Sequence, residues 1–499
     1  MKKDNNNVCH LLDKLGDLTT DDTLDSIFLT EANKNITYKT ALFRIHVLTD
    51  VLKSKKVRSG VVVGIYLDRS IDAAISIYSV LYNGCAYLPL NKSDPIARIY
   101  DIMSRAKVNH VVTTKNDAPL FKEYVIVTVD DDVNMFDTNI ALDFNFKKFA
   151  SAYTKHNIAA IFYTSGSTGH PKLVAMSHLA MVTFADWAGN TFKVGNTDKI
   201  ANLAPFSFDL SVFDLFTSLR FKSQVIFMSQ EFTISPAKLL EWFNANMVTI
   251  WYTVPTMLHF WLKWLPNSNI GKGLMLRTIL FAGEVMPIVV IRKLSAILIN
   301  TEFYNLYGPV ETNVCLYWKV DKNRLEYLNK MPIGKPTCGC IVKIDNKTSE
   351  LYVKGPTLLS GYISNKFIAY HGWYNTKDCV SINDIGEFVY IGRNDRTFKI
   401  YGFRVAAEEV ENALLLIDGI DDCVVFNTEY NNSSVILACI ISNQSLSKSF
   451  LTDTVSKFLP QYMLPSLYLE FDHFPKLVSG KKDLLSIRTI ALQRIQSST

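Results

Sequence analysis

The sequence predicts an α/β fold: a large N-terminal domain of mostly parallel sheets with a β-rich subdomain, then a small α+β C-terminal domain. Short β-branched runs alternate with helical segments, as at Val61 to Leu67 and Ile71 to Leu81, which is typical of parallel sheets covered by helices. Around Ser349 to Gly392 the pattern changes to short alternating segments separated by Gly and Asn. A chain of 499 residues also exceeds what one hydrophobic core normally supports. We therefore expect two domains, 1–394 and 395–499.

Hydrophobic periodicity assigns the elements of the first part of the chain. Leu42, Ile45 and Leu48 recur at helical spacing, so a strand followed by a helix is predicted from Asn35 to about Lys56. The helix that follows the next strand ends before a turn signal, Asn83-Gly84. Buried strands are predicted from apolar, β-branched runs at 61–67, 86–90, 108–113, 124–129 and 158–162.

The remaining elements follow the same reasoning. A helix is predicted at Leu173 to Ala188. Further strands are predicted at 225–228, 248–252, 278–282, 350–353 and 386–391. After a Gly/Asn/Asp-rich segment, the C-terminal region is predicted to hold helices at 406–417 and 451–458 and strands at 422–427 and 435–441. This set is sufficient for a separate small domain.

Composition excludes several classes of partner. The net charge of +5 is mild and no Lys/Arg block occurs, so no nucleic-acid partner is expected. The longest apolar candidate, Met275 to Ile299, is interrupted by Arg277, Glu284, Arg292 and Lys293, so no membrane association is expected. The N-terminus lacks a signal-peptide core, and eight scattered cysteines indicate reduced, mostly buried thiols. A cytoplasmic protein with a small-molecule partner is predicted.

The segment Tyr163 to Lys172 is a candidate phosphate-binding loop. It follows an apolar strand and combines glycines, hydroxyl groups and a lysine. Glycines let backbone N–H groups approach an anion, hydroxyls donate further hydrogen bonds, and lysine supplies positive charge. The Walker A spacing is absent, which excludes a P-loop NTPase. A solvated connector of the same composition remains the alternative at this point.

Further motifs lie downstream of this loop in a fixed order. They are Phe208 to Ser211, Asn305 to Thr312, Tyr374 to Asp378, Gly392 to Arg404, Leu459 to Pro465 and Ser479 to Lys481, preceded by Ile36 to Tyr38 and Gly84 to Leu90. With them the chain resembles the adenylate-forming superfamily, which includes acyl- and aryl-CoA ligases, luciferase and the adenylation domains of nonribosomal peptide synthesis. Among these it is similar to stand-alone proline-activating enzymes that load a carrier protein for secondary metabolites. The resemblance covers nearly the whole chain.

The resemblance implies ATP as substrate and assigns residues to it. The loop residues Thr164, Ser165, Gly166, Ser167, Thr168, Gly169 and Lys172 would bind phosphates. Tyr307 would stack on adenine and Asn305 would bind its amino edge, while Asp378 would accept hydrogen bonds from both ribose hydroxyls. The other residues expected at the nucleotide are Gly283, Glu284, Gly308, Tyr390 and Arg393. Without the surrounding motifs, core packing would be the preferred interpretation of Tyr307.

Joining a carboxylate to the α-phosphate of ATP brings two anions together, so positive charge is required. By the resemblance, Glu311 would ligate Mg²⁺ and Lys481 would stabilise charge in the adenylation transition state. The small C-terminal domain would be mobile and rotate about a hinge at Asp395 for the second half-reaction. A surface turn for Glu311 and a solvated position for Lys481 are the ordinary alternatives.

The resemblance also implies an amino-acid pocket. Asp209 would pair with the α-amino group of the substrate, and an N-cap role at Leu210 is compatible with it. The remaining lining would be Leu210, Phe213, Tyr252, Leu280, Ala282, Leu306, Val314 and Cys315, with Lys481 closing over the carboxylate. This lining is almost wholly apolar, so a small apolar amino acid, with L-proline preferred, is the expected substrate.

A carrier-domain serine motif is absent from the chain, so a separate phosphopantetheinylated carrier protein is the expected acceptor. Three alternatives remain: another small apolar amino acid, an acyl or aryl acid with coenzyme A as acceptor, and a weakened nucleotide-binding scaffold. The chain departs from the family at Val310, where Thr is usual, at Lys377, where Gly is usual, and at Ala406-Ala407, where Glu-Leu is usual. Of these, Val310 most affects the expected catalytic rate.

Overall fold

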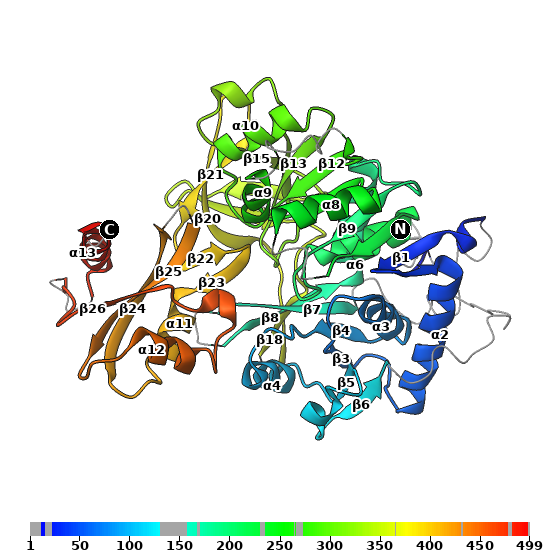
Figure 1. Ribbon diagram of the computed structural model, residues 1–499, viewed down its shortest axis with the longest axis horizontal. Coiled ribbons are helices and arrows are strands. Elements are labelled where there is room, and N and C mark those ends of the chain that lie inside the picture. The colour runs from blue at the N-terminus through cyan, green and yellow to red at the C-terminus, as the bar shows by residue number, and fades with distance from the viewer. Residues whose placement is uncertain are drawn as a thin grey trace, which may run out of the picture. The chain divides into compact units, whose positions relative to one another are not determined.

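The computed structural model describes residues 11–14, 22–129, 157–166, 170–229, 235–263, 265, 273–364, 366–430, 433–477 and 482–497 (Figure 1). The α/β prediction is confirmed: large sheets with flanking helices make up most of the chain, and a small α+β region follows. The chain divides into two compact units. The first unit comprises Met1–Lys92, Met103–Phe162 and Leu173–Asn394, and the second comprises Ser93–Ile102, Tyr163–Lys172 and Asp395–Thr499.

Within the described residues, thirteen strands of the first unit form one sheet, in the order β16-β17-β20-β21-β15-β14-β13-β12-β11-β9-β10-β1-β2. Its parallel strands are β1 (Ile27–Glu31), β9 (Lys199–Asn202), β10 (Gln224–Phe227), β11 (Ile250–Thr253), β12 (Thr278–Phe281) and β13 (Glu302–Tyr307). Antiparallel strands extend both edges: β2 (Lys34–Thr37), β14 (Leu316–Lys319), β15 (Pro332–Pro336), β16 (Ile341–Ile344), β17 (Glu350–Lys354), β20 (Tyr374–Ile382) and β21 (Phe388–Arg393). The β-rich region is therefore continuous with the parallel sheet through β14 and β15.

A second sheet has the order β19-β18-β8-β7-β4-β3-β5-β6 among the described residues. Its strands are β3 (Val62–Ile65), β4 (Ala86–Pro89), β5 (His110–Thr113), β6 (Val125–Thr128), β7 (Ile158–Thr164), β8 (Lys172–Ser177), β18 (Gly361–Ser364) and β19 (Lys366–Ala369). The first five residues of the helix predicted at Leu173 to Ala188 belong to strand β8, so that prediction was wrong there. The run Leu173 to Met176 is fully buried beside β18, and Ser177 caps the helix that follows. Leu, Ala and Met do not distinguish a short buried strand from a helix.

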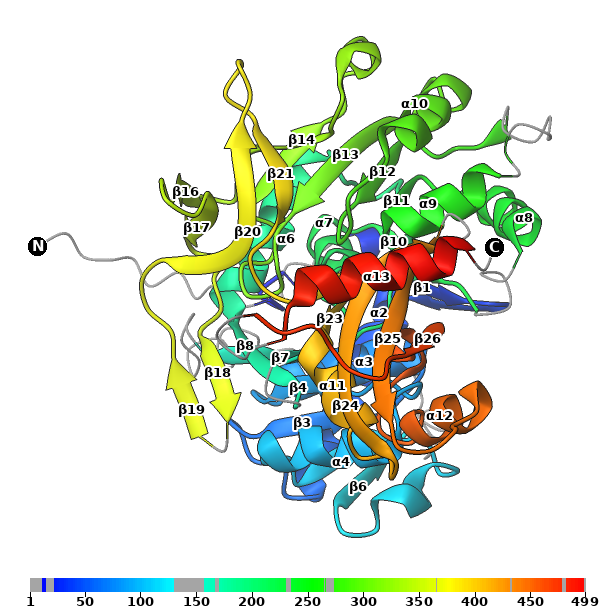
Figure 2. The same ribbon diagram turned by 90° about the vertical axis from the view of Figure 1, so that its left-hand side faces the viewer.

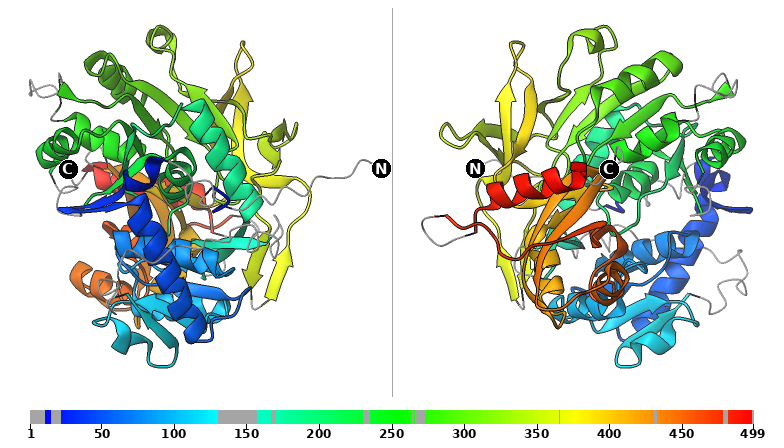
Figure 3. Two further views of the ribbon diagram at one scale, coloured as in Figure 1. Left: turned by 90° about the vertical axis from the view of Figure 1, so that its right-hand side faces the viewer. Right: turned by 60° about the vertical axis from the view of Figure 1, so that its left-hand side comes forward.

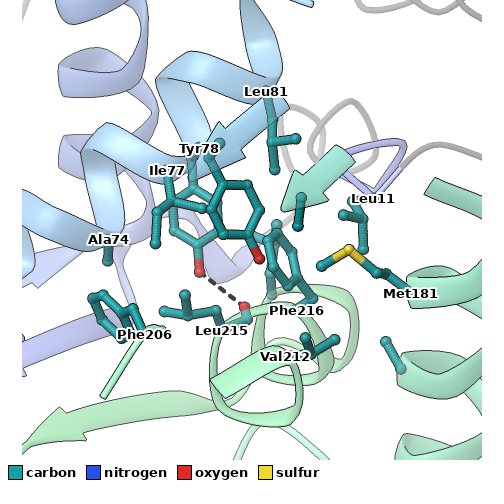
Figure 4. Close-up of a cluster of buried hydrophobic side chains, with 14 of the residues drawn as sticks. Leu11, Ala74, Ile77, Tyr78, Leu81, Met181, Phe206, Val212, Leu215 and Phe216 are labelled. Carbon is teal, nitrogen blue, oxygen red and sulfur yellow. Dashed lines mark hydrogen bonds between the residues drawn. The ribbon is translucent and has the colours of Figure 1, made fainter. Parts of the chain in front are cut away.

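Helices cover these sheets. They are α2 (Tyr38–Ser54), α3 (Ile71–Tyr82), α4 (Ile96–Arg105), α6 (His178–Thr191), α7 (Ser218–Phe221), α8 (Pro236–Asn246), α9 (Pro255–Leu262) and α10 (Ile288–Ile297), with short 3-10 turns at Asp22–Asp25, Ala118–Phe121 and Leu325–Tyr327. In the main core, Tyr78 of α3 donates a hydrogen bond to the carbonyl of Leu215 at 2.8 Å, and Phe216 packs beside it (Figure 4). Phe213–Thr217 is a π-helical turn that leads into α7. None of the described helices is both long and apolar enough to cross a bilayer.

In the second unit, strands β22 (Thr397–Ile400) and β23 (Phe403–Ala406) form a hairpin, and β24 (Ile420–Tyr430), β25 (Ser433–Ser442) and β26 (Leu467–Glu470) form a separate sheet. Helices α11 (Ala407–Leu414) and α12 (Lys448–Val455), with a 3-10 turn at Gln461–Met463, pack on one face of this sheet, and α13 (Leu484–Ser497) packs on the other. Figures 2 and 3 show α13 lying across strands β24 and β25. Two small cores therefore stabilise this α+β region.

Candidate active site

The phosphate-loop candidate joins the end of β7 to the start of β8 and belongs to the second unit. Thr164 ends β7, and its Oγ1 is buried without a hydrogen-bond partner among the described residues. Gly166 has no space for a side chain, because a Cβ there would lie 2.2 Å from the carbonyl oxygen of His170. Lys172 begins β8. Ser167, Thr168 and Gly169 lie outside the described residues.

The described part of this loop holds an anionic oxygen. The Ser165 hydroxyl and the Gly166 N–H both donate to Oε2 of Glu409, at 2.5 Å and 3.0 Å. The Ser165 hydroxyl accepts a hydrogen bond from the Ala406 N–H at 2.7 Å. These donors have the chemistry that a phosphate oxygen requires, and Thr164 adds an unpartnered hydroxyl beside them. The loop residues therefore fit the triphosphate of ATP.

Tyr307, Asp378 and Arg393 lie together in the first unit. One carboxylate oxygen of Asp378 pairs with Arg393, and the other accepts a hydrogen bond from the Tyr307 hydroxyl at 2.5 Å. Asp378 and Arg393 are direct partners across β20 and β21. Burial, followed by the nearby Asp378 carboxylate, raises the pKa of Tyr307 well above its ordinary value. The Asp378 carboxylate is thus held in a fixed orientation; its binding to ribose and the stacking of Tyr307 on adenine stay predictions.

The other residues expected at adenine make structural contacts. Asn305 donates from Nδ2 to the carbonyl of Pro332 at 2.7 Å. Glu284 accepts hydrogen bonds at the N-terminus of α9, from the Thr256 N–H at 2.9 Å and the Thr256 hydroxyl at 2.5 Å. Gly283 has a φ of +95°, which favours glycine. Gly308 has no space for a Cβ, since it would lie 1.5 Å from a backbone oxygen. Tyr390 lies on β21 and packs against a small apolar cluster.

Glu311 is the candidate metal ligand. It is 1% exposed, and Tyr362 donates to its Oε1 at 3.5 Å. No group of three or more His, Cys, Asp or Glu side chains suited to a metal occurs among the described residues. Mg²⁺ in nucleotide sites uses one or two carboxylates together with waters and substrate phosphates, so a single buried carboxylate fits it. Lys481 lies outside the described residues, as do Ser479 and Gly480.

The described residues predicted to line the amino-acid pocket all lie in the first unit. Leu210, Phe213, Tyr252, Leu280, Ala282, Leu306 and Val314 belong to one buried apolar cluster, and Cys315 belongs to the neighbouring one. Three of them, Tyr252, Leu280 and Leu306, lie on the parallel strands β11, β12 and β13, with Tyr252 directly opposite Leu280. The rings of Phe213 and Tyr252 meet edge to face at 5.8 Å. These contacts make the apolar lining rigid.

Asp209 is half-buried and lies near Tyr252, whose pKa is raised well above its ordinary value first by burial and then by the Asp209 charge. The following helical segment begins at Ser211, and the backbone carbonyl of Asp209 accepts from the Val212 N–H at 3.1 Å. A carboxylate at the edge of an apolar cluster is suited to pairing with an ammonium group.

Sequence reasoning missed a second carboxylate close to these residues. Asp214 follows Phe213 in the π-helical turn, is completely buried, and accepts a hydrogen bond from Asn202 at 2.7 Å. Burial raises its pKa to about 8, although Asn202 and the charge of Arg69 oppose that shift. The signal was an aspartate inside the apolar run Val212 to Phe216. Glu409 and Arg98 were missed as well, because their contacts join distant parts of the sequence.

One departure from the family pattern has a structural explanation. Lys377 has a φ of +63°, in the left-handed region where glycine is favoured. Its side chain lies 3.7 Å from Glu350. Val310 packs against the main core as a partly buried side chain. Ala406 and Ala407 are 1% exposed, so the two small residues fit a close contact.

Comparison with known proteins gives consistent matches. A protein-family model described as AMP-binding enzyme matches residues 19–363. A protein of Streptomyces coelicolor named L-proline–(L-prolyl-carrier protein) ligase is 31% identical over 483 residues, covering 90% of this chain and 91% of the relative. A protein of the same name from Pseudomonas fluorescens is 28% identical over 471 residues, covering 91% of this chain and 93% of the relative.

Among solved structures, the Vibrio cholerae adenylation domain AlmE, in complex with glycyl-adenosine-5'-phosphate, has a TM-score of 0.82 at 20% identity, covering 100% of this chain and 99% of that chain. This likeness shows a shared fold. The family match spans more than half of the chain. The chain belongs to the AMP-binding enzyme family and is an adenylate-forming ligase.

Proposed function

We propose that the protein activates L-proline with ATP to give prolyl-AMP and pyrophosphate, and then transfers the prolyl group to the phosphopantetheine thiol of a separate carrier protein. The observation that carries this proposal is the composition of the candidate pocket. Its seven predicted lining residues between Leu210 and Val314 all belong to one buried apolar cluster, and the half-buried Asp209 directly precedes the first of them. The names of the two relatives, both L-proline–(L-prolyl-carrier protein) ligases, support the same substrate.

Proline suits this lining for two physical reasons. Its secondary ammonium can pair with the Asp209 carboxylate, which would be costly to bury against apolar groups without a cation. Its compact ring requires only apolar contacts, such as those of Phe213 and Tyr252. The predicted lining other than Asp209 and Lys481 carries no charge, so it offers no opposite charge to a charged side chain. Discrimination against valine depends on shape and is worth about 1–3 kcal/mol per methylene.

In the first half-reaction, a carboxylate oxygen of proline attacks the α-phosphorus of ATP, and the bond to the bridging oxygen of pyrophosphate breaks. We assign Ser165, Gly166 and Lys172 to the phosphates and Asp378 with Arg393 to the ribose. Mg²⁺, which Glu311 would hold, supplies positive charge for the leaving group. Lys481 is assigned by resemblance to the charge that develops at the reacting carboxylate.

In the second half-reaction, the carrier thiol attacks the acyl carbon, the thioester C–S bond forms and AMP leaves. We assign the hinge for the change between the two half-reactions to Asp395. The boundary between the two compact units falls between Asn394 and Asp395, which supports this assignment. Oδ1 of Asp395 also accepts hydrogen bonds from the N–H and hydroxyl of Thr397, so the turn after the boundary is well defined.

The test is amino-acid-dependent exchange of labelled pyrophosphate into ATP, with Mg²⁺, for the common amino acids, salicylate and a medium-chain fatty acid. Proline is expected to give the dominant signal, and Asp209→Ala is expected to abolish it. Asp384→Ala, at an exposed carboxylate, is the matched control and is expected to keep full activity. A dominant signal from another acid, or equal activity in Asp209→Ala, would refute the proline assignment. Transfer to a loaded carrier rather than to coenzyme A tests the acceptor.

A further inference from the structure

Glu409 fills the hydrogen-bonding positions of the phosphate loop. Its Oε2 accepts from the Ser165 hydroxyl at 2.5 Å and from the Gly166 N–H at 3.0 Å. All three residues belong to the second unit. A phosphate oxygen bound by these two donors would occupy the same position as Oε2. Carboxylate and phosphate therefore exclude each other at this site.

Arg98 holds the other oxygen of the same carboxylate. Its Nη1 pairs with Oε1 of Glu409, and the two side chains are 5% and 1% exposed. Burial lowers the pKa of Arg98, but Glu409, Tyr462 and Asp94 together outweigh burial and raise it above the ordinary value. A buried carboxylate is costly unless it is paired and hydrogen-bonded, and Glu409 has one ion pair and two hydrogen bonds. The contact is a complete anion site filled by a side chain.

Other groups around Arg98 make the release of this carboxylate feasible. Asp94 is also buried and adds a second negative charge near Arg98. The Tyr163 hydroxyl donates to Oδ2 of Asp94 at 2.8 Å, and the Tyr462 ring lies near Arg98 while it stacks on Phe403 at 4.1 Å. When Glu409 leaves, Arg98 keeps Asp94 as a counter-charge. The cost of leaving a buried arginine unpaired is thereby reduced.

We propose that Glu409 is a positioning residue that the phosphate loop exchanges for the pyrophosphate portion of ATP, with Arg98 retaining it while the loop holds no nucleotide. ATP binding must displace helix α11, which carries Glu409, from the loop. Release of pyrophosphate lets the carboxylate return, and its return opposes rebinding of pyrophosphate. This exchange depends on adenylate formation and not on which amino acid is activated.

The direct test is calorimetric titration of MgPPi and of Mg-α,β-methylene-ATP, which cannot react, with no amino acid present. Glu409→Gln removes the competing charge, so it is expected to bind both ligands at least fivefold more tightly than the unmodified protein. Glu408→Gln is the matched control, because Glu408 precedes Glu409 in α11 and its side chain is 32% exposed. The control is expected to bind within twofold of the unmodified protein. Equal or weaker binding by Glu409→Gln would overturn the proposal.

A second variant guards against misfolding from the unpaired Arg98. In the double variant Arg98→Met with Glu409→Gln, the buried charges are removed together, which proteins often tolerate. The same increase in affinity is expected, and its absence from a folded double variant contradicts the proposal. Hydrogen exchange on the unmodified protein needs no variant: Mg-α,β-methylene-ATP is expected to speed exchange of the amides in Ala407–Leu414. Unchanged or slower exchange there would also overturn it. None of these measurements uses proline, so their outcome is independent of the substrate assignment.

Discussion

A buried carboxylate paired with an arginine occurs both in strands β20 and β21, as Asp378 with Arg393, and beside the phosphate loop, as Glu409 with Arg98, but the two pairs are built differently. Asp378 and Arg393 are 15 residues apart and directly opposite in one β-hairpin, with side chains 7% and 10% exposed. Arg98 and Glu409 are 311 residues apart, with side chains 5% and 1% exposed. The first pair is fixed by strand register. The second depends on long-range packing within its unit, and a contact of that kind can be exchanged without unfolding a strand.

The largest expected effect comes from breaking the fixed pair. Asp378→Ala leaves Arg393 and the Tyr307 hydroxyl without their shared carboxylate. We expect kcat/KM for ATP in pyrophosphate exchange to fall by about 100-fold, because losing charge-assisted hydrogen bonds costs about 1.5–3 kcal/mol each. Asp384→Ala, in the same hairpin and exposed, is the control. An unchanged KM for ATP would show that Asp378 does not contact the nucleotide.

The second-largest expected effect is on nucleotide binding by the phosphate loop. In Gly166→Ala the added Cβ would lie 2.2 Å from a backbone oxygen, so the loop must shift. We expect the affinity for MgATP to fall about tenfold, equivalent to about 1.4 kcal/mol. Gly195→Ala is the matched control, since a Cβ there meets nothing within 4 Å. If both variants bind MgATP equally well in a calorimetric titration, the loop does not depend on this close backbone approach.

Asp214 is a third buried carboxylate and differs from the other two. The charge of Arg69 acts on it, but among the described residues its hydrogen bond comes from Asn202 and not from an arginine. Its pKa is raised to about 8 in the folded protein. The protonated Asp214 therefore stabilises the fold fully at pH values below the pKa it has in the unfolded chain, and this stabilisation is lost as the pH rises through about 8. Arg69, Tyr78 and Tyr252 are the titratable groups that face it.

Asp214→Asn is expected to remove this loss of stability. Between pH 5 and pH 8.5 the free energy of unfolding should decrease in the unmodified protein. We expect this decrease to exceed that of the variant by about 1 kcal/mol or more, since one pKa unit corresponds to about 1.36 kcal/mol. Denaturant unfolding of both proteins at several pH values measures the difference. Parallel pH profiles would mean that Asp214 titrates normally.

The smallest effect concerns the residue that precedes Asp378. Lys377→Gly relieves a left-handed backbone at φ +63° but loses a partly exposed contact with Glu350. A more flexible unfolded chain offsets part of the gain. We expect the free energy of unfolding to change by less than about 1 kcal/mol, with ATP affinity unchanged. A thermal unfolding scan with a parallel ATP titration checks both values, and a large loss of ATP affinity would contradict a purely local role.

Sequence patterns predicted what is local in this molecule. Periodicity and turn residues predicted strands such as β3, β4, β12, β24 and β25 and helices such as α2, α3 and α11. The family motifs pointed to Asp378 and Arg393, which lie in one hairpin. The strand Leu173 to Met176 was taken for a helix, because its burial depends on β18, almost two hundred residues later. Contacts such as Arg98 with Glu409 have no local signature, so no periodicity could have predicted them.

The Asp214 site shows the same limit. An aspartate in an apolar run is visible in the sequence, but its burial and its hydrogen bond from Asn202 depend on the packing of a π-helical turn. Such a turn has no distinctive residue pattern. The pocket residues on β11, β12 and β13 were assigned by the family resemblance and stay predictions; parallel pairing places these three strands side by side.

The position of Arg393 in the chain has a mechanical consequence. It stands two residues before Asp395, and its pairing with Asp378 ties the last strand of the first unit to the neighbouring strand. A change of backbone torsion at Asp395 therefore moves the residues that follow it, while the Arg393–Asp378 pair holds the preceding strand in place. Under the proposed assignments of Asp378 to the ribose and Asp395 to the hinge, a rotation leaves the ribose contacts of prolyl-AMP in place. The adenylate would then stay bound until the carrier thiol attacks its acyl carbon and AMP leaves.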